Sequence, residues 1–275
     1  MTSPVDIHPA LRPGQVAVIT GGASGIGLAA ARRLKAVGMQ VLIADIPGPK
    51  LEALRREFPG ALDADVAKFV DVQRLAAAAA KLGDVTVLMN NAGTGRGAPS
   101  SWEDLAQWRA LLDTNLWGVI HGVHAFAPAM ISRGARALII NTGSKQGITL
   151  PPGNPAYTLS KAGVKAYTET LAHELRGVAA GAVTAHLLIP GFTFTGMSLA
   201  AEKPASAWMP EQVVEFLFAA LTRDAFYILC ADNDVTRDID EKRILWAAGD
   251  IIENRPALSR WHADYAVEFA HYMSS

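Results

Sequence analysis

The chain has 275 residues, of which 50% are hydrophobic and 19% are charged, and its formal net charge is −1. This composition excludes a disordered polypeptide, and the near balance of acidic and basic residues argues against nucleic acid as a partner. Cys230 is the one cysteine and the seven histidines show no ligand spacing, so we expect neither a disulfide framework nor a metal site.

The first segment, residues 1–13, is polar and contains prolines, and we expect it to be an extension of the fold. It lacks the apolar stretch of a signal peptide, and no run in the chain approaches the roughly 18 apolar residues that span a bilayer. We therefore expect a cytoplasmic protein without membrane attachment.

Residues 14–234 alternate short β-rich runs with segments of helical periodicity. This alternation is typical of a parallel sheet covered by helices on both faces, so we predict a single-domain α/β fold with a doubly wound sheet. The expected strands are Gln15–Thr20, Gln40–Asp45, Ala61–Asp65, Val85–Asn90, Ala137–Thr142, Val183–Ile189 and Phe226–Cys230. The expected helices are Gly25–Val37, Pro49–Phe58, Phe69–Leu82, Trp102–Ile131, Ala156–Val178 and Pro210–Leu221.

Two segments interrupt this alternation. Residues 192–209 form a loop rich in apolar and small residues, and residues 235–275 form a C-terminal tail with a helical pattern over residues 239–252. Helical spacing relates four aromatic residues near the end, which indicates a packing stripe: Trp261, Tyr265, Phe269 and Tyr272. We expect the tail to pack on the same domain or on a neighbouring subunit, with Trp246, Trp261 and Tyr265 against that subunit or over the mouth of the pocket.

A glycine-rich turn links the first predicted strand to the first predicted helix, with the sequence Thr20-Gly21-Gly22-Ala23-Ser24-Gly25-Ile26-Gly27. In this position backbone N–H groups and the helix dipole create an anion site, and glycine lets a pyrophosphate approach the backbone. The turn predicts a dinucleotide-binding site. A tight turn without a ligand is the alternative.

Asp45 ends the second predicted strand, where a carboxylate can accept hydrogen bonds from the adenosine ribose hydroxyls. It would repel a 2′-phosphate, and the neighbouring Ser24 and Ile46 are not basic, which favours NAD over NADP. The alternative is an aspartate that begins the turn before Pro47. Asp65 ends the third strand and is a candidate contact for the adenine edge.

Tyr157 and Lys161 are four residues apart and lie on one face of the expected helix. A free tyrosine titrates near 10. A cation about 4 Å away, at an effective dielectric constant of about 20, stabilises the phenolate by roughly 4 kcal/mol. We therefore expect Lys161 to lower the pKa of Tyr157 until it can act as a base near neutral pH.

Two further polar side chains are candidates for the same site. Ser144 follows the fifth predicted strand, and the carboxyl ends of parallel strands meet in one crevice, so its hydroxyl can bond the reacting oxygen. Asn115 lies inside a predicted helix, where the alternative is a polar residue facing a neighbour.

Taken together, these motifs resemble the short-chain dehydrogenase/reductase family, over about Gln15 to Cys230. The resemblance implies a Rossmann-type sheet of seven parallel strands, a nicotinamide cofactor, and a tetramer or dimer formed through the two long helices. It places Asn115, Ser144, Tyr157 and Lys161 on the catalytic positions. The implied cofactor contacts are Gly21, Ser24, Gly25, Ile26, Gly27, Asp45, Ile46, Asp65, Val66, Asn91, Ala92, Gly93, Tyr157, Lys161, Pro190, Gly191, Thr193 and Thr195.

The implied reaction interconverts a secondary alcohol and its ketone. In this implied reaction, Tyr157 exchanges the hydroxyl proton while hydride passes between the carbinol carbon and the nicotinamide. Lys161 lowers the pKa of Tyr157 and binds the ribose. Ser144 positions the substrate oxygen, and Asn115 keeps a water path for the proton.

The substrate-binding residues are less constrained by the motifs. Phe192, Met197 and Trp208 in the apolar loop predict an apolar or aromatic-lined pocket, with Arg96 and Gln146 as polar contacts. Lys145 either reaches an anionic group of the substrate or faces solvent. An NADPH-dependent 3-oxoacyl carrier-protein reductase is the alternative enzyme, and a catalytically silent NAD-binding sensor is the alternative of another class.

Overall fold

The computed structural model describes residues 7–97, 100–178, 181–197 and 202–275. Residues 1–6 of the predicted N-terminal extension and residues 198–201 of the predicted loop lie outside this part of the chain. Within the described ranges no helix has both the length and the apolar character needed to cross a membrane.

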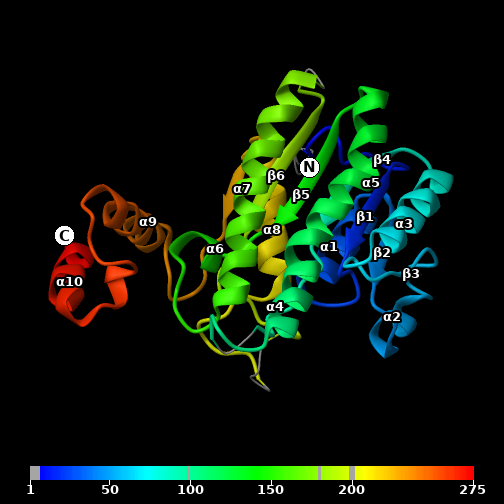
Figure 1. Cartoon of the computed structure of the whole chain (residues 1–275). Coiled ribbons are helices and arrows are strands. Elements are labelled where there is room, and N and C mark those ends of the chain that lie inside the picture. Colours follow the sequence, from blue (N-terminus) through cyan, green and yellow to red (C-terminus); the bar gives the residue numbers. More distant parts are fainter. Residues whose placement is uncertain (1–6, 98–99, 179–180, 198–201) are drawn as a thin grey trace.

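A seven-stranded parallel sheet forms the centre of the molecule, in the order β3-β2-β1-β4-β5-β6-β7 (Figure 1). This confirms the predicted α/β fold. The chain order reverses between β1 and β4, which opens a crevice at the carboxyl ends of these two strands. The strands are β1 (Val16–Thr20), β2 (Gln40–Asp45), β3 (Leu62–Asp63), β4 (Val85–Asn90), β5 (Ala137–Thr142), β6 (Val183–Ile189) and β7 (Tyr227–Leu229).

Helices cover both faces of the sheet (Figure 1) because successive strand side chains point to opposite sides. In β1, Ala17 and Ile19 join the apolar cluster under α1, α2 and α8, whereas Val16 and Val18 join the cluster under α3, α5 and α7. The covering helices are α1 (Gly25–Ala36), α2 (Pro49–Leu54), α3 (Phe69–Leu82), α5 (Gly118–Arg133), α7 (Pro155–Val178) and α8 (Pro210–Leu221).

The single helix predicted over Trp102–Ile131 is instead three consecutive segments. These are α4 (Leu105–Leu112), a π-helical turn η1 (Asp113–Trp117) and α5. The helix begins after Asp104, whose carboxylate caps it by accepting from the N–H of Gln107 at 3.0 Å, and this leaves Trp102 outside the helix. The predicted third strand is also shorter than expected, since Asp65 closes a turn by accepting from the N–H of Ala67.

The tail contains α9 (Arg237–Ile252), two short 3₁₀ turns and α10 (Ala266–Ser274), and it extends away from the sheet (Figure 1). Trp246 is only 4% exposed and its ring contacts Phe269 and Tyr272 at centroid distances of 5.1 and 5.2 Å. Its indole N–H donates to Ser259 Oγ at 2.7 Å. The tail therefore encloses Trp246 in an aromatic cluster of its own, and the placement of the tail against a neighbouring subunit or over the pocket mouth stays a prediction.

The tail contacts the rest of the domain through α9. Ile244 of α9 packs against the apolar cluster that contains Leu187, Ile189 and Leu229 at the ends of β6 and β7. Beside it lies α6 (Gln146–Thr149), a short helix that directly follows the Ser144–Lys145 segment. This contact brings the tail next to the loop that carries Ser144.

Two histidines are buried, His8 ahead of β1 and His186 in the middle of β6. His8 Nδ1 accepts from the N–H of Ala10 at 3.1 Å while Nε2 faces Asp224 Oδ1 at 3.2 Å. His186 Nδ1 lies 2.9 Å from the carbonyl of Ala225, and its Nε2 lies 2.8 Å from Thr184 Oγ1. Each set of partners suits a neutral ring, and burial lowers the pKa of both His8 and His186 below 6.5.

We expect the protein to lose stability as the pH falls below about 6.5, because the unfolded chain then binds protons that the folded histidines refuse. The two neutral histidines contribute their full stabilisation at pH values above the pKa that they have in the unfolded chain. This stabilisation is lost as the pH falls toward their lower pKa in the folded protein. Urea unfolding at about pH 7.5 and pH 5.5 measures the loss. His8→Gln and His186→Gln should each reduce it, whereas His173→Gln, at an exposed position on α7, should leave it unchanged. An equal loss in all four proteins would contradict this assignment.

Candidate active site

The structure brings the four predicted catalytic residues together at the carboxyl ends of β4 and β5. Tyr157 and Lys161 lie on one face of α7, Ser144 follows β5, and Asn115 lies in η1. The phenol of Tyr157 faces the hydroxyl of Ser144, and Nζ of Lys161 lies 5.7 Å from the centroid of the phenol ring. A Cβ atom added to Gly93 would lie 3.3 Å from Asn115 Oδ1 and 3.7 Å from Lys161 Nζ, so this loop closes against both side chains.

Asn115 is fully buried and its amide is satisfied by protein groups. Its Oδ1 accepts from the N–H of Thr94 at 2.8 Å, and its Nδ2 donates to the carbonyl of Thr94 at 2.9 Å and to Ser160 Oγ at 3.3 Å. The side chain thus joins the loop after β4 to α7. These contacts match the neighbour-facing alternative, and a water path at this position would have to use the main chain of Asn115.

Lys161 is a buried cation whose Nζ donates to the carbonyl of Thr142 at 2.8 Å. Loss of hydration lowers the pKa of Lys161 from 10.5 to about 8. The bond to Thr142 joins α7 to the end of β5, two residues before Ser144.

Burial raises the pKa of Tyr157 above 10, and the hydrogen bond with Ser144 opposes the rise. This direction is opposite to the one that we predicted from the Tyr157–Lys161 spacing. The reason is that both groups occupy the same buried site, where the charged form of each loses its water.

The sequence analysis missed Asn154, which positions the start of α7. Its Oδ1 accepts from the N–H of Tyr157 at 3.3 Å, and its Nδ2 donates to the carbonyl of Gly95 at 3.0 Å. Asn154 therefore ties the helix turn that carries the phenol to the loop that carries Arg96. An asparagine directly before Pro155 is a typical helix-start pattern and could have revealed it.

The glycine turn has the tight geometry that a dinucleotide site needs. Gly21 has a φ of +66°, and a Cβ atom at Gly27 would lie 2.2 Å from the carbonyl oxygen of Gly21. The side chain of Ser24 does not cap α1, so the N–H groups of its first turn are available to an anion.

Neighbouring strands support this turn. Asp45 Oδ2 accepts from the N–H of Ala23 at 2.9 Å, which holds the carboxylate at the turn. Asn91 Nδ2 donates to the carbonyl of Thr20 at 3.1 Å, and the N–H of Ala92 donates to Thr20 Oγ1 at 3.1 Å. A bare anion site with a carboxylate at the end of the second strand fits a dinucleotide with free ribose hydroxyls.

The remaining predicted cofactor residues surround the same crevice. Ile46 is exposed beside Asp45, and the carbonyl of Val66, after Asp65, lies 2.8 Å from Nδ1 of His121. Thr195 lies over the glycine turn, since a Cβ atom at Gly25 would be 3.1 Å from its Cγ2. Thr193 Oγ1 donates to the carbonyl of Gly191 at 3.1 Å in the segment that begins at Pro190.

Lys50 is a second residue that the sequence analysis did not place at the site. A Cβ atom at Gly196 would lie 3.1 Å from its Nζ, so α2 brings a cation to the loop beside Thr195. The basic residue lies five positions after Asp45 in the chain, beyond the immediate neighbours on which the prediction was based.

The predicted substrate residues divide into two groups. Phe192 and Met197 are exposed, 45% and 54% respectively, and a Cβ atom at Gly95 would lie 3.9 Å from Sδ of Met197. Arg96 and Gln146 are also exposed. Trp208 differs, because its indole packs against Phe216 of α8 at a centroid distance of 6.0 Å while its main chain bonds Phe192 and Phe194.

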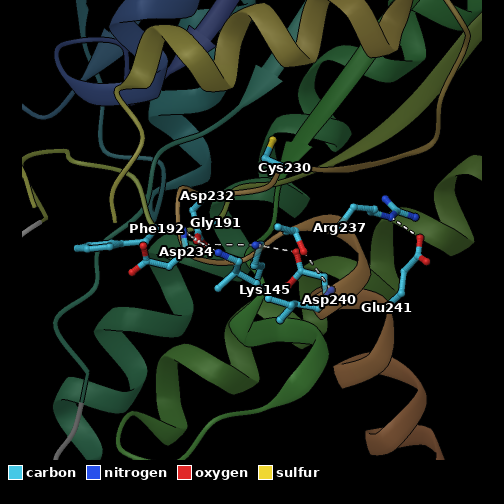
Figure 2. Close-up of polar contacts among 12 residues, drawn as sticks. Lys145, Gly191, Phe192, Cys230, Asp232, Asp234, Arg237, Asp240 and Glu241 are labelled. Carbon is cyan, nitrogen blue, oxygen red and sulfur yellow. Dashed lines mark hydrogen bonds and ion pairs between the residues drawn. The ribbon is translucent and has the colours of Figure 1, made fainter. Parts of the chain in front are cut away.

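Lys145 does not face solvent, which corrects one of the two alternatives predicted from the sequence. Its Nζ lies 2.7 Å from Asp240 Oδ2 and 3.4 Å from Asp232 Oδ2, in an ion-pair cluster next to Ser144 (Figure 2). The two carboxylates follow Lys145 by 95 and 87 residues, so no local pattern could have indicated them.

Comparison with known proteins identifies the family of the chain. A family model described as short chain dehydrogenase matches residues 15–205. The chain belongs to the short-chain dehydrogenase family. It is an oxidoreductase that acts on an alcohol or the corresponding ketone, which confirms the predicted family and reaction class.

The chain is 31% identical to 1-deoxy-11-beta-hydroxypentalenate dehydrogenase from Streptomyces exfoliatus over 266 residues, which cover 92% of this chain and 96% of that enzyme. A short-chain dehydrogenase/reductase from Burkholderia phymatum, solved in complex with NAD, has a TM-score of 0.79 and 31% identity and covers 89% of this chain and 96% of its own. A metagenomic short-chain oxidoreductase in complex with NADP has a TM-score of 0.66 and 30% identity, with 80% and 98% covered.

We expect Lys161→Met to stabilise the fold while removing activity. Lowering the pKa of Lys161 from 10.5 to about 8 costs about 3 kcal/mol of folding free energy at pH 7, where the group is charged in both states. Since the bond to Thr142 is also lost, we expect a net gain of about 2 kcal/mol at pH 7 that shrinks as the pH rises from 8 toward 10.5.

Urea unfolding at pH 7 and about pH 9.5 measures this gain. Lys165→Met, at a more exposed position on the same helix, is the matched control and should show no such gain. A Lys161→Met protein less stable than the wild type at pH 7 would contradict the electrostatic assignment.

Proposed function

We propose that the protein is an NAD-dependent dehydrogenase of secondary alcohols, with Tyr157 as the proton-exchanging group. The observation that carries this proposal is the contact of the Tyr157 phenol with the Ser144 hydroxyl, with the buried ammonium of Lys161 behind the ring. A phenol and a hydroxyl that face each other can both bond one alcohol oxygen, and the adjacent glycine turn fits a dinucleotide.

Ser144, Tyr157 and Lys161 have separate roles in the proposed reaction. When bound, NAD supplies the hydride acceptor and a positive ring that favours the phenolate form of Tyr157. Ser144 donates to the substrate oxygen and orients it, and Tyr157 takes the hydroxyl proton during oxidation and returns it during reduction. Lys161 keeps two of its three hydrogens free after bonding Thr142, so it can bind the nicotinamide ribose and disfavour the protonated phenol.

NAD is favoured over NADP by the carboxylate of Asp45. Because its Oδ2 is held by the N–H of Ala23, the charge stands at the place where the adenosine ribose would lie, and a 2′-phosphate there would face a fixed negative charge. Lys50 approaches the same crevice from the side of Thr195 and Gly196, where it can contact the pyrophosphate.

The proposed substrate is an apolar or aromatic alcohol. Support comes from Phe192 and Met197, which present apolar surface beside the catalytic residues, and from the apolar residues that line the following loop. One relative, 1-deoxy-11-beta-hydroxypentalenate dehydrogenase, is also named for a substrate that bears a hydroxyl group. A panel of secondary alcohols, sterols, sugars and aryl carbinols, assayed with NAD, tests the substrate class.

Tyr157→Phe should abolish NADH formation, at least about 1,000-fold, because it removes the hydroxyl that we propose exchanges the proton, while NAD binding changes little. Absorbance at 340 nm measures the rate and calorimetry measures binding. Tyr167→Phe removes a hydroxyl ten residues further along the same helix and should retain activity. Turnover by the Tyr157→Phe protein would reject Tyr157 as the base, and a wild type that binds NAD without oxidising any alcohol would favour the sensor alternative.

Asp45→Ala should relax the preference for NAD by about 10-fold or more, measured as the ratio of kcat/KM with NAD to that with NADP. The control is Asp63→Ala, which removes the carboxylate paired in register with Asp45 at the end of β3. That aspartate bonds Arg55 and does not touch the glycine turn. An unchanged cofactor ratio in Asp45→Ala would discredit the proposed ribose contact.

A further inference from the structure

A cluster of three buried charges joins the catalytic segment to the C-terminal tail. Lys145 directly follows Ser144, Asp232 lies in the loop after β7, and Asp240 lies in α9 (Figure 2). The Lys145 side chain is 17% exposed and each carboxylate side chain is 6% exposed. A single ammonium is therefore shared between two carboxylates that water scarcely reaches.

Asp232 also holds the segment that follows β6. Its Oδ2 accepts from the N–H of Phe192 at 3.2 Å, while its Oδ1 accepts from the N–H groups of Asp234 and Val235 at 3.2 and 2.8 Å. Gly191 lies between the charged groups, since a Cβ atom there would be 2.7 Å from Asp232 Oδ2 and 3.1 Å from Lys145 Cε. The main chain completes the contact, because the N–H of Lys145 donates to the carbonyl of Pro190 at 3.4 Å.

The start of α9 at Arg237 places Asp240 in the first turn of the helix, from which its carboxylate reaches this cluster. Thr236 caps the helix by accepting from the N–H of Ile239, and its carbonyl accepts from the N–H of Asp240 at 3.1 Å. Ile244, one turn further on, packs against the cluster at the ends of β6 and β7. The tail thus supplies a second carboxylate to a lysine that borders the catalytic serine.

We propose that Asp240 and Lys145 are positioning residues, through which the tail helix holds Ser144 and the Pro190–Phe192 segment in their places. This proposal rests on the proposed function, in which Ser144 orients the substrate oxygen and the Pro190–Phe192 segment borders the cofactor. Neither Asp240 nor Lys145 needs to touch the reacting atoms. Lys145→Met leaves the two carboxylates without their shared cation, and Asp240→Asn removes the charge by which α9 attracts Lys145, so in either variant the segments on both sides of Lys145 are free to shift.

The test compares Lys145→Met, Asp240→Asn and the double variant with the wild type, all as full-length proteins. Glu241→Gln is the matched control, because Glu241 is the next residue of the same helix and pairs with Arg237 at 2.6 Å on the exposed side (Figure 2). NADH formation is measured with the best alcohol from the panel. Hydrogen exchange of residues 143–150 and 186–197 is measured by mass spectrometry without cofactor.

We expect each single variant to lower kcat about 10- to 100-fold with a KM for the alcohol that stays within about threefold, because a misplaced serine weakens the reaction more than substrate binding. The double variant should be no slower than the slower single variant, since both substitutions break one interaction. Exchange should rise in both segments for these variants and should match the wild type in Glu241→Gln.

Wild-type kinetics and exchange in Asp240→Asn and Lys145→Met, or rate losses that multiply in the double variant, would overturn the proposal. A wild type that oxidises no alcohol of the panel would instead contradict the proposed function. In that case, hydrogen exchange alone still decides whether Asp240 and Lys145 hold the two segments.

Discussion

The hydrogen bond from the buried ammonium of Lys161 to the carbonyl of Thr142 determines how the catalytic helix sits on the sheet. Tyr157 lies one helical turn before Lys161, and Ser144 lies two residues after Thr142, so this one bond brings the phenol to the hydroxyl. A second bond, from Asn141 Nδ2 to Thr168 Oγ1 at 3.1 Å, fixes α7 two turns further along. The helix is thereby held against β5 at two places, and the geometry of the site follows from the sheet.

Burying ionisable groups in this arrangement reduces the free energy of unfolding, and these groups lie in the candidate active site. The lowered pKa of Lys161 and the raised pKa of Tyr157 both arise because burial removes water from their charged forms. Burial also raises the pKa of Asp240, whose carboxylate is balanced by Lys145. The apolar clusters on the two faces of the sheet provide the stability that allows such groups to remain inside.

The sheet and most of its helices could be predicted because their signals are local. β4 and β5 are fully buried strands with largely apolar sequences, and the buried residues of α3 recur at helical spacing. For this reason the predicted bounds of these three elements agree with the structure. Ser144, Tyr157 and Lys161 were predicted in the same way, from spacing and strand ends, whereas Asn115 was predicted from the family resemblance, and the roles of all four stay predictions. The partners of Lys145 could not be found, because contacts between residues 87 and 95 positions apart leave no periodicity. The direction of the pKa of Tyr157 also depends on burial, which spacing alone does not report.

Because of the π-helical turn at Asp113–Trp117, the position of Asn115 depends on the number of residues in the helical stretch formed by α4, η1 and α5. Such a turn accommodates an additional residue within an otherwise α-helical rod, and here it carries Asn115 inward to meet Thr94 and Ser160. Deleting one residue from the turn would let it close into a regular α-helix and change the orientation of Asn115, whereas a deletion elsewhere in α4 or α5 would rotate everything beyond it by about 100° around the helix axis. Surface loops usually accept insertions and deletions. In this helical stretch they would either withdraw the Asn115 amide from its partners or turn the apolar face of α5 away from the sheet. The number of residues between Leu105 and Arg133 is therefore constrained.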